Sequence, residues 1–203
     1  MNRRKFCLTS AAAAISGAAG GFTCLPAAAQ TDPLRPAAAA ANVRLYKFIY
    51  DHRYPAGRAF GAAAEHARST AGVVAIGGDV TALWSSDLRP RWSAGGGAIA
   101  GMTTARTLLC LEQLAGDHGM RVMIRAEHAI SERHEIMHRL TATEPMIARL
   151  RSALAAEDWA EQMPAALTTG QGADRAPRIT CVMGSCERRF TMTADALVSF
   201  VIA

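Results

Sequence analysis

The chain has 203 residues and a mass of 21.5 kDa; half of the residues are hydrophobic and 19% are charged. This length is typical of a single domain, and the composition allows a buried core and excludes a disordered polymer. The formal net charge of +5 comes largely from Arg3, Arg4 and Lys5, because without them 19 basic residues face 17 acidic ones. So small an excess argues against a nucleic-acid partner.

Residues 1–29 have the three parts of an export signal: a basic start, a weakly apolar stretch rich in Ala and Gly, and small residues before Gln30. The adjacent arginines, followed by Lys5 and Phe6, resemble the twin-arginine (Tat) signal. An ordinary secretory signal is the alternative. The apolar stretch is too short and too often interrupted by glycine to act as a membrane anchor, so we expect no anchor in the mature protein. We therefore expect a periplasmic or secreted protein.

The resemblance to a Tat signal implies that the chain folds before it crosses the membrane and that its first partner is the Tat export machinery. Such proteins often carry a cofactor inserted in the cytoplasm, or work beside an enzyme or a cofactor-bearing partner. The sequence does not identify a cofactor. After the signal we expect a flexible, Pro- and Ala-rich leader over residues 30–42 and a single α/β domain over residues 43–203.

Strand and helix patterns alternate through the first half of this domain. In chain order we expect a strand at Val43–Tyr50, a helix at Pro55–Arg68, a strand at Gly72–Ile76, a short helix from Asp79 to Trp84, a loop through Arg89–Trp92 and Gly95–Gly97, a strand at Ala98–Met102, a helix from Thr103 or Thr104 to about Ala115, and a strand at Met120–Ala126. This alternation is typical of a mostly parallel sheet with right-handed crossovers. It predicts a three-layer α/β fold of the Rossmann or flavodoxin kind.

The second half predicts an antiparallel extension of that sheet. In chain order we expect a strand at His134–Thr141 that returns beside the preceding one, a helix at Met146–Met163, a loop at Thr168–Pro177, and strands at Arg178–Met183 and Ala196–Ile202. The last strand is nearly all apolar, which favours a central or well-covered position in the sheet.

Polar residues follow each of the first four predicted strands. In doubly wound sheets, ligands bind beyond the carboxyl ends of the strands. Asp51, His52 and Asp79 are the acid/base candidates at these ends; Thr103, Thr104, Glu127 and His128 are the ligand-binding candidates. The two threonines begin a helix, where hydroxyls and free N–H groups hold anions. Caps and turns are the structural alternative, and no GxGxxG dinucleotide motif is present.

A second candidate site is the literal HExxH motif that begins at His134. On a helix, His134 and His138 share one face and bind Zn²⁺, with Glu135 as general base. Glu157 follows at a spacing that resembles the third ligand of gluzincin metallopeptidases. The pattern suits a strand equally well, however, and in a strand the two histidines lie about 13 Å apart, too far to share a metal.

The three cysteines beyond the signal predict structure rather than redox chemistry. Cys110 lies in an apolar helical run and is expected in the core. Cys181 and Cys186, separated by a segment containing Gly184, are placed to close a hairpin as a disulfide. A redox dithiol is the alternative, although the spacing is CxxxxC and not CxxC.

These observations favour an exported α/β domain that binds a small ligand or a partner protein as an accessory to a larger system. Two alternatives stay open. One is a zinc-dependent hydrolase that uses His134, Glu135, His138 and Glu157. The other is an enzyme with its acid/base site at the strand ends.

Overall fold

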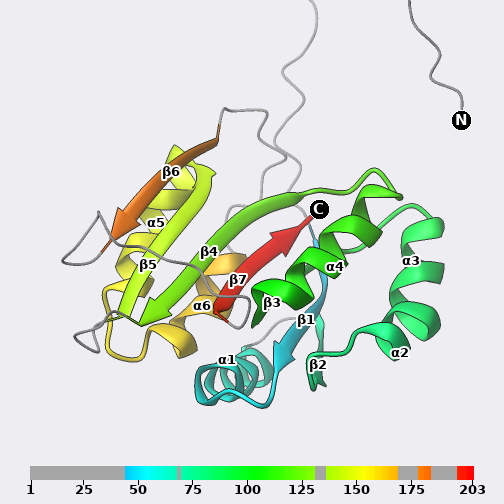
Figure 1. Ribbon diagram of the computed structural model, residues 1–203, viewed down its shortest axis with the longest axis horizontal. Coiled ribbons are helices and arrows are strands. Elements are labelled where there is room, and N and C mark those ends of the chain that lie inside the picture. The colour runs from blue at the N-terminus through cyan, green and yellow to red at the C-terminus, as the bar shows by residue number, and fades with distance from the viewer. Residues whose placement is uncertain (1–43, 68–69, 131–135, 169–177, 184–195) are drawn as a thin grey trace, which may run out of the picture. The chain divides into compact units, whose positions relative to one another are not determined.

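The computed structural model describes residues 44–67, 70–130, 136–168, 178–183 and 196–203. Its strands are β1 (Leu45–Asp51), β2 (Gly72–Ile76), β3 (Ala98–Thr104), β4 (Val122–Ile130), β5 (Ile136–Thr143), β6 (Arg178–Met183) and β7 (Leu197–Ile202). Its helices are α1 (Pro55–His66), α2 (Thr81–Leu83), the π-helix η1 (Trp84–Leu88), α3 (Arg89–Ser93), α4 (Ala105–Gly116), α5 (Glu144–Leu154) and α6 (Trp159–Thr168). The predicted α/β class is confirmed (Figure 1).

The seven strands form one mixed sheet in the order β2-β1-β3-β7-β4-β5-β6. β1 pairs in parallel with β2 and β3, and the other four pairings are antiparallel. The prediction of a mostly parallel sheet therefore holds only for its first three strands. β4 does run in the direction of β3, but β7 lies between them and runs the other way.

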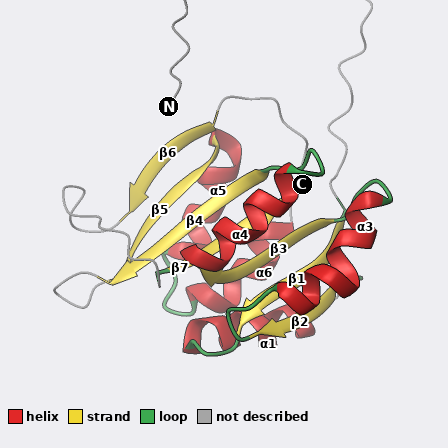
Figure 2. Cartoon of the chain, turned by 45° about the vertical axis from the view of Figure 1, so that its right-hand side comes forward, coloured by secondary structure: helices red, strands yellow, loops and turns green. Residues whose placement is uncertain are grey.

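Neighbouring residues on each strand point to opposite faces, so the sheet builds two separate cores. Phe48 packs with Phe60 of α1 and with α5 and α6 on one face. Ile49 packs with the α2–α3 segment and α4 on the other face. Figure 2 shows α4 and α3 on one side of the sheet and α5, α6 and α1 on the other.

Two segments differ from their predicted structure. Arg89–Trp92, expected as a loop, belongs to helix α3, because proline is tolerated in the first turn of a helix and Leu88 and Trp92 bury one face of it. The helix expected over Met146–Met163 is two helices, α5 and α6, separated by a turn at residues 155–158.

Cys110 is exposed on α4, so its prediction as a core residue is wrong. The buried face of this helix consists of Thr107, Leu108, Leu111 and Ala115, and Cys110 lies outside that stripe. The apolar run alone did not distinguish the two faces of the helix. Among the described helices, none has the length and apolar character needed to span a membrane.

At one position the chain leaves two neighbouring strands toward opposite faces of the sheet. β1 and β3 lie side by side, and each continues into a helix beyond its carboxyl end. α1 packs on one face of the sheet, whereas α4 packs on the other. The chain therefore diverges above the carboxyl ends of β1 and β3, which is the arrangement that makes a ligand crevice in open α/β sheets.

Candidate functional site

Asp51 ends β1 and is fully buried at this point of divergence. Its carboxylate accepts hydrogen bonds from Arg53: Oδ1 from the backbone N–H at 3.2 Å and from Nε at 2.9 Å, and Oδ2 from Nη2 at 2.6 Å. The guanidinium is about half exposed, with 48% of the side chain accessible. Asp51 therefore anchors an arginine that reaches from the buried strand end to the surface.

Two opposing effects act on the pKa of Asp51. Burial raises this pKa, but the hydrogen bonds and charge of Arg53 outweigh burial and hold the pKa below the ordinary value of 3.8. The carboxylate is ionised at neutral pH and accepts three hydrogen bonds from Arg53. It is suited to positioning Arg53 and not to accepting a proton from a substrate.

A chain of close contacts links this pair to the end of β3. Gly78 lies against Arg53, because a Cβ built on Gly78 would come within 2.2 Å of Nη2. The Gly78 carbonyl accepts a hydrogen bond from Thr107 Oγ1 at 3.0 Å. Thr107 Oγ1 lies 3.0 Å from Thr104 Oγ1, and the Thr107 N–H donates to the same oxygen at 3.3 Å. The segments that follow the three parallel strands thus meet: the loops after β1 and β2, and the first turn of α4 after β3.

The other candidates at this edge differ in their exposure. His52 and Asp79 are exposed, and Asp79 Oδ1 accepts the Thr81 N–H at 2.8 Å at the start of α2. Thr103 is fully buried, and its hydroxyl donates to the Thr104 carbonyl at 3.3 Å. Asp51 and Asp79 are therefore both engaged in local structure, and both His52 and Asp79 are exposed at this edge.

The side chains of Glu127 and His128 belong to different clusters, because adjacent residues on β4 point to opposite faces of the sheet. Glu127 is nearly buried; its Oε1 accepts from Arg125 Nε at 3.0 Å, and its Oε2 accepts from Arg139 Nε. Arg125 also reaches Glu112 of α4 at 3.4 Å. Glu127 belongs to an ion-pair network on the α4 side of the sheet, and His128 lies on the other side.

His128 belongs to a buried polar cluster between β4, β5, β7 and α6. Its Nδ1 lies 2.8 Å from Nδ1 of His138, the residue directly opposite on β5, and its Nε2 lies 2.9 Å from Ser199 Oγ on β7. The Trp159 ring covers both imidazoles, with centroid distances of 4.3 Å to His128 and 5.1 Å to His138. All four side chains are less than 9% exposed.

Burial controls the protonation of this cluster. It lowers the pKa of His138 to about 4. Burial, together with the adjacent His138, also lowers the pKa of His128 well below its ordinary value of 6.5. Both imidazoles are therefore neutral at pH 7, and a single N–H joins the two Nδ1 atoms.

Ser199, His128 and His138 are arranged like a nucleophile, a base and a group that orients the base. Ser199 has no exposed surface and Trp159 is packed over the two rings. A substrate has no described path to the hydroxyl, so this geometry does not support acyl transfer.

The part of the HExxH motif that the structure describes, residues 136–138, is a strand and not a helix. His138 lies on β5 (Ile136–Thr143), and its side chain engages His128. His134 and Glu135 lie outside the described residues. Glu157 is exposed in the turn between α5 and α6. Because the zinc interpretation depends on a helix, the strand at His138 argues against it.

Cys181 lies half-buried on β6, on the face that packs against α5. Its predicted partner, Cys186, lies outside the described residues. The disulfide between them therefore stays a prediction.

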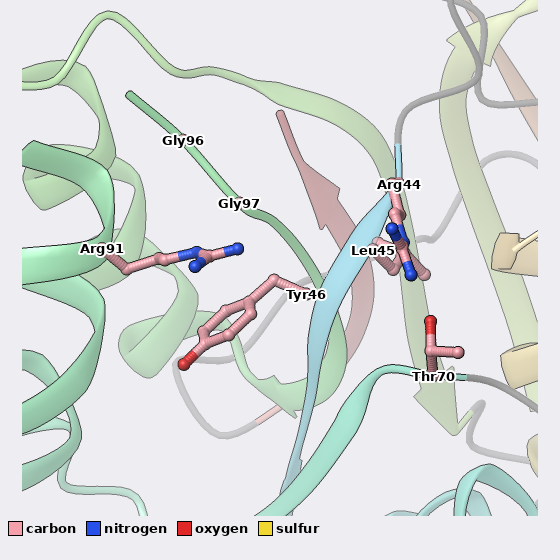
Figure 3. Close-up of a pocket in the computed structure, with 7 residues that line it drawn as sticks. All are labelled: Arg44, Leu45, Tyr46, Thr70, Arg91, Gly96 and Gly97. Atoms are coloured by element: carbon pink, nitrogen blue, oxygen red, sulfur yellow. The ribbon is translucent and has the colours of Figure 1, made fainter. Parts of the chain in front are cut away.

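A hollow of about 440 Å³ lies at the amino ends of the same parallel strands, lined by Arg44, Leu45, Tyr46, Thr70, Arg91, Gly96 and Gly97 (Figure 3). The Arg91 guanidinium lies over the Tyr46 ring, 4.6 Å from its centroid. The Tyr46 hydroxyl donates to Asp87 Oδ1 at 2.5 Å, and Lys47 pairs with the same carboxylate. These contacts tie β1 to η1 and α3, and they give Tyr46 and Arg91 a structural role at the hollow.

Comparisons with protein-family models, curated proteins and solved structures find no match to this chain. The candidate site therefore rests on topology and side-chain geometry. The strand-end residues were predictable, since each follows a strand pattern directly. The ion pair of Arg53 with Asp51 was not predicted, because it depends on the path of the chain after β1. Thr107 was missed because its role depends on a contact with Gly78, and the pairing of His128 with His138 was missed because it depends on strand register.

Proposed function

We propose that this protein is an exported α/β domain that binds a small anionic ligand at the carboxyl ends of β1, β2 and β3, as an accessory to a larger system. The observation that carries the proposal is that the segments after the three strands meet through Arg53, Gly78 and Thr107, where the chain diverges to opposite faces. The β2-β1-β3 order matches the first part of a flavodoxin-like sheet, whose ligand binds between β1 and β3.

The charges at this edge favour an anion. α1 and α4 both begin here, and neither has an acidic residue in its first turn, so the positive ends of both helix dipoles remain uncompensated by acids. Arg58 and Arg106 are exposed in the first turns of these helices. Asp51 is already paired with Arg53, and among the residues that the structure describes at this edge Asp79 is the acid that opposes these arginines.

The environment of Asp51 favours binding over acid/base catalysis at this edge. A general acid or base needs a pKa near the working pH and an accessible proton. Asp51 has a lowered pKa, is buried and is held by Arg53. Export is supported by the basic, apolar and small-residue pattern of residues 1–29.

Native mass spectrometry of protein recovered from the periplasm tests the ligand, and denaturing mass spectrometry of the same sample tests cleavage after Ala29. We expect a bound anionic mass that is lost from the His52→Ala and Arg106→Ala variants. Both residues are exposed, so their replacement leaves the core intact. Arg151→Ala, an exposed arginine on α5, is the matched control and keeps the bound mass.

A ligand lost during purification is tested by thermal unfolding with inorganic phosphate, citrate and a nucleoside monophosphate. Specific binding raises the melting temperature of the wild type and of Arg151→Ala more than that of Arg106→Ala. Equal responses from all three proteins, or no bound mass and no response, would contradict the proposed function.

A further inference from the structure

We infer that the hollow at the amino ends of β1, β2 and β3 binds a small dicarboxylate between Arg44 and Arg91. This hollow lies at the opposite end of β1 from Asp51, about 20 Å away at the usual rise per residue of a strand. The inference is independent of the proposed anion site at the carboxyl ends of the strands. It starts from an open space that is lined by positive charge.

The hollow has the size of a small-molecule site. Its volume of about 440 Å³ falls within the range of about 300–1,000 Å³ that is typical of ligand pockets. Its lining comes from segments far apart in the chain: the start of β1, Thr70 before β2, Arg91 on α3, and Gly96 and Gly97 before β3 (Figure 3). Because β1 is paired with both β2 and β3, the strands fix the positions of these walls.

Two glycines keep one wall of the hollow free of side chains. Gly96 and Gly97 have φ angles of 130° and 142°, in the region that favours glycine. A Cβ on Gly97 would lie 3.2 Å from Cγ of Arg91 and from Cβ of Tyr46, so the missing side chain lets both residues pack against the backbone. A Cβ on Gly96 would meet nothing within 4 Å, so the space beside this residue is open.

The charge around the hollow favours an anion. Among the described residues that line it, two are arginines and none is acidic. Neither Arg44 nor Arg91 takes part in an ion pair within the part of the chain that the structure describes. Asp87, the acid beside the hollow, already accepts hydrogen bonds from Tyr46 and Lys47. Three cations and one acid thus lie at this end of β1, which leaves an excess of positive charge for a ligand.

The placement of the two arginines favours a ligand with two separate carboxylates. Figure 3 shows Arg91 and Arg44 on opposite sides of Tyr46. A guanidinium binds a carboxylate through two parallel N–H···O bonds, so each arginine takes one carboxylate. The Thr70 hydroxyl lines the Arg44 side and donates to the carboxylate bound there. Leu45 and the Tyr46 ring offer apolar surface to the methylene groups between the two carboxylates.

The test is isothermal titration calorimetry of the purified full chain with succinate at low ionic strength, with acetate as the matched anion that has one carboxylate. We expect acetate to bind more weakly than succinate. Arg44→Gln and Arg91→Gln should each weaken succinate binding about 10- to 100-fold, because each removes a charged, bidentate contact. Arg151→Gln, which replaces an exposed arginine on α5, is the control and leaves the affinity unchanged.

Arg44 is exposed, so Arg44→Gln decides the test if Arg91→Gln, which also loses the contact with the Tyr46 ring, does not fold. Circular dichroism of each variant checks its fold. Absence of succinate binding by the wild type would overturn the inference, as would unchanged affinity in folded Arg44→Gln. Loss of succinate binding in Arg106→Ala with unchanged binding in Arg44→Gln would also overturn it, and would place the ligand at the carboxyl ends of the strands. Failure at Arg44 leaves the proposed function standing, because that function is tested at Arg106.

Discussion

At the scale of single residues, Asp51 makes the contact with the clearest dependence on pH. Its pKa is below 3.8 in the folded protein, so its ionised form stabilises the fold at pH values above about 4. This contribution falls as the pH decreases through the folded pKa. We expect Asp51→Asn to lower the free energy of unfolding at pH 7 by about 1–3 kcal/mol, because a buried charged hydrogen-bond acceptor is lost.

Urea unfolding of the wild type and Asp51→Asn between pH 3 and pH 7 measures this contribution. The difference between the two proteins should shrink below pH 4, where the wild-type carboxyl group takes up a proton. Glu157→Gln, an exposed acid in a turn, controls for the loss of one charge and should leave stability unchanged. A difference that stays constant across this pH range would contradict the role assigned to Asp51.

Gly57 is required by the close approach of α1 to the end of β1. A Cβ on Gly57 would lie 2.2 Å from the Asp51 carbonyl oxygen. Gly57→Ala should therefore destabilise the protein by about 1–3 kcal/mol, although alanine is the better helix former. Gly116→Ala, at the end of α4 with open space around its Cβ position, should have an effect within about 1 kcal/mol of zero.

Thermal or urea unfolding of the two alanine variants compares them directly. Equal stabilities for Gly57→Ala and Gly116→Ala would show that α1 can move away from β1 at little cost. In that case, the backbone contact at Asp51 would not be what fixes the start of α1.

At the scale of elements, Thr104 links strand β3 to helix α4. It is the N-cap residue of α4, where its Oγ1 accepts the Thr107 N–H. Thr104→Val keeps the shape of the side chain but removes this bond and the contact with the Thr107 hydroxyl. We expect a loss of about 0.5–2 kcal/mol in urea unfolding, and recovery in Thr104→Ser, which keeps the hydroxyl. A Val variant as stable as the wild type would contradict the capping role.

Single elements were largely predictable because their signals are local. The strand at Gly72–Ile76 was predicted with its observed bounds, and the cap at Thr104 follows from a threonine between an apolar strand and an apolar helix. Helix α3 was missed because Pro90 and two arginines resemble a loop in composition. Only the burial of Leu88 and Trp92 against the sheet explains why that segment is helical.

At the scale of the whole sheet, the strand order was not predictable from local patterns. β7 was expected to be central or well covered because it is apolar, but nothing in its sequence specifies β3 and β4 as neighbours. The contact between His128 and His138 depends on the pairing of β4 with β5 and on its register. A one-residue shift of β5 would turn His138 to the other face of the sheet.

The sheet order also predicts which backbone amides are best protected. β7 is bonded on both sides, whereas β2 and β6 each have one neighbouring strand. In native-state hydrogen exchange we expect β7 amides to exchange only through global unfolding, and those of β6 to exchange faster through local opening. Protection in β6 equal to that in β7 would contradict this order of stability.

The position of β7 has a kinetic consequence. β1, β2 and β3 form one part of the sheet and β4, β5 and β6 form another, and the strands of these parts are joined through β7. β7 follows β3 by more than ninety residues in the sequence, so the central pairing closes a long loop. Long-range pairing of this kind slows folding and leaves the facing edges of β3 and β4 open to other strands until β7 arrives. The newly made chain is therefore most vulnerable to aggregation before residues 197–202 take their place.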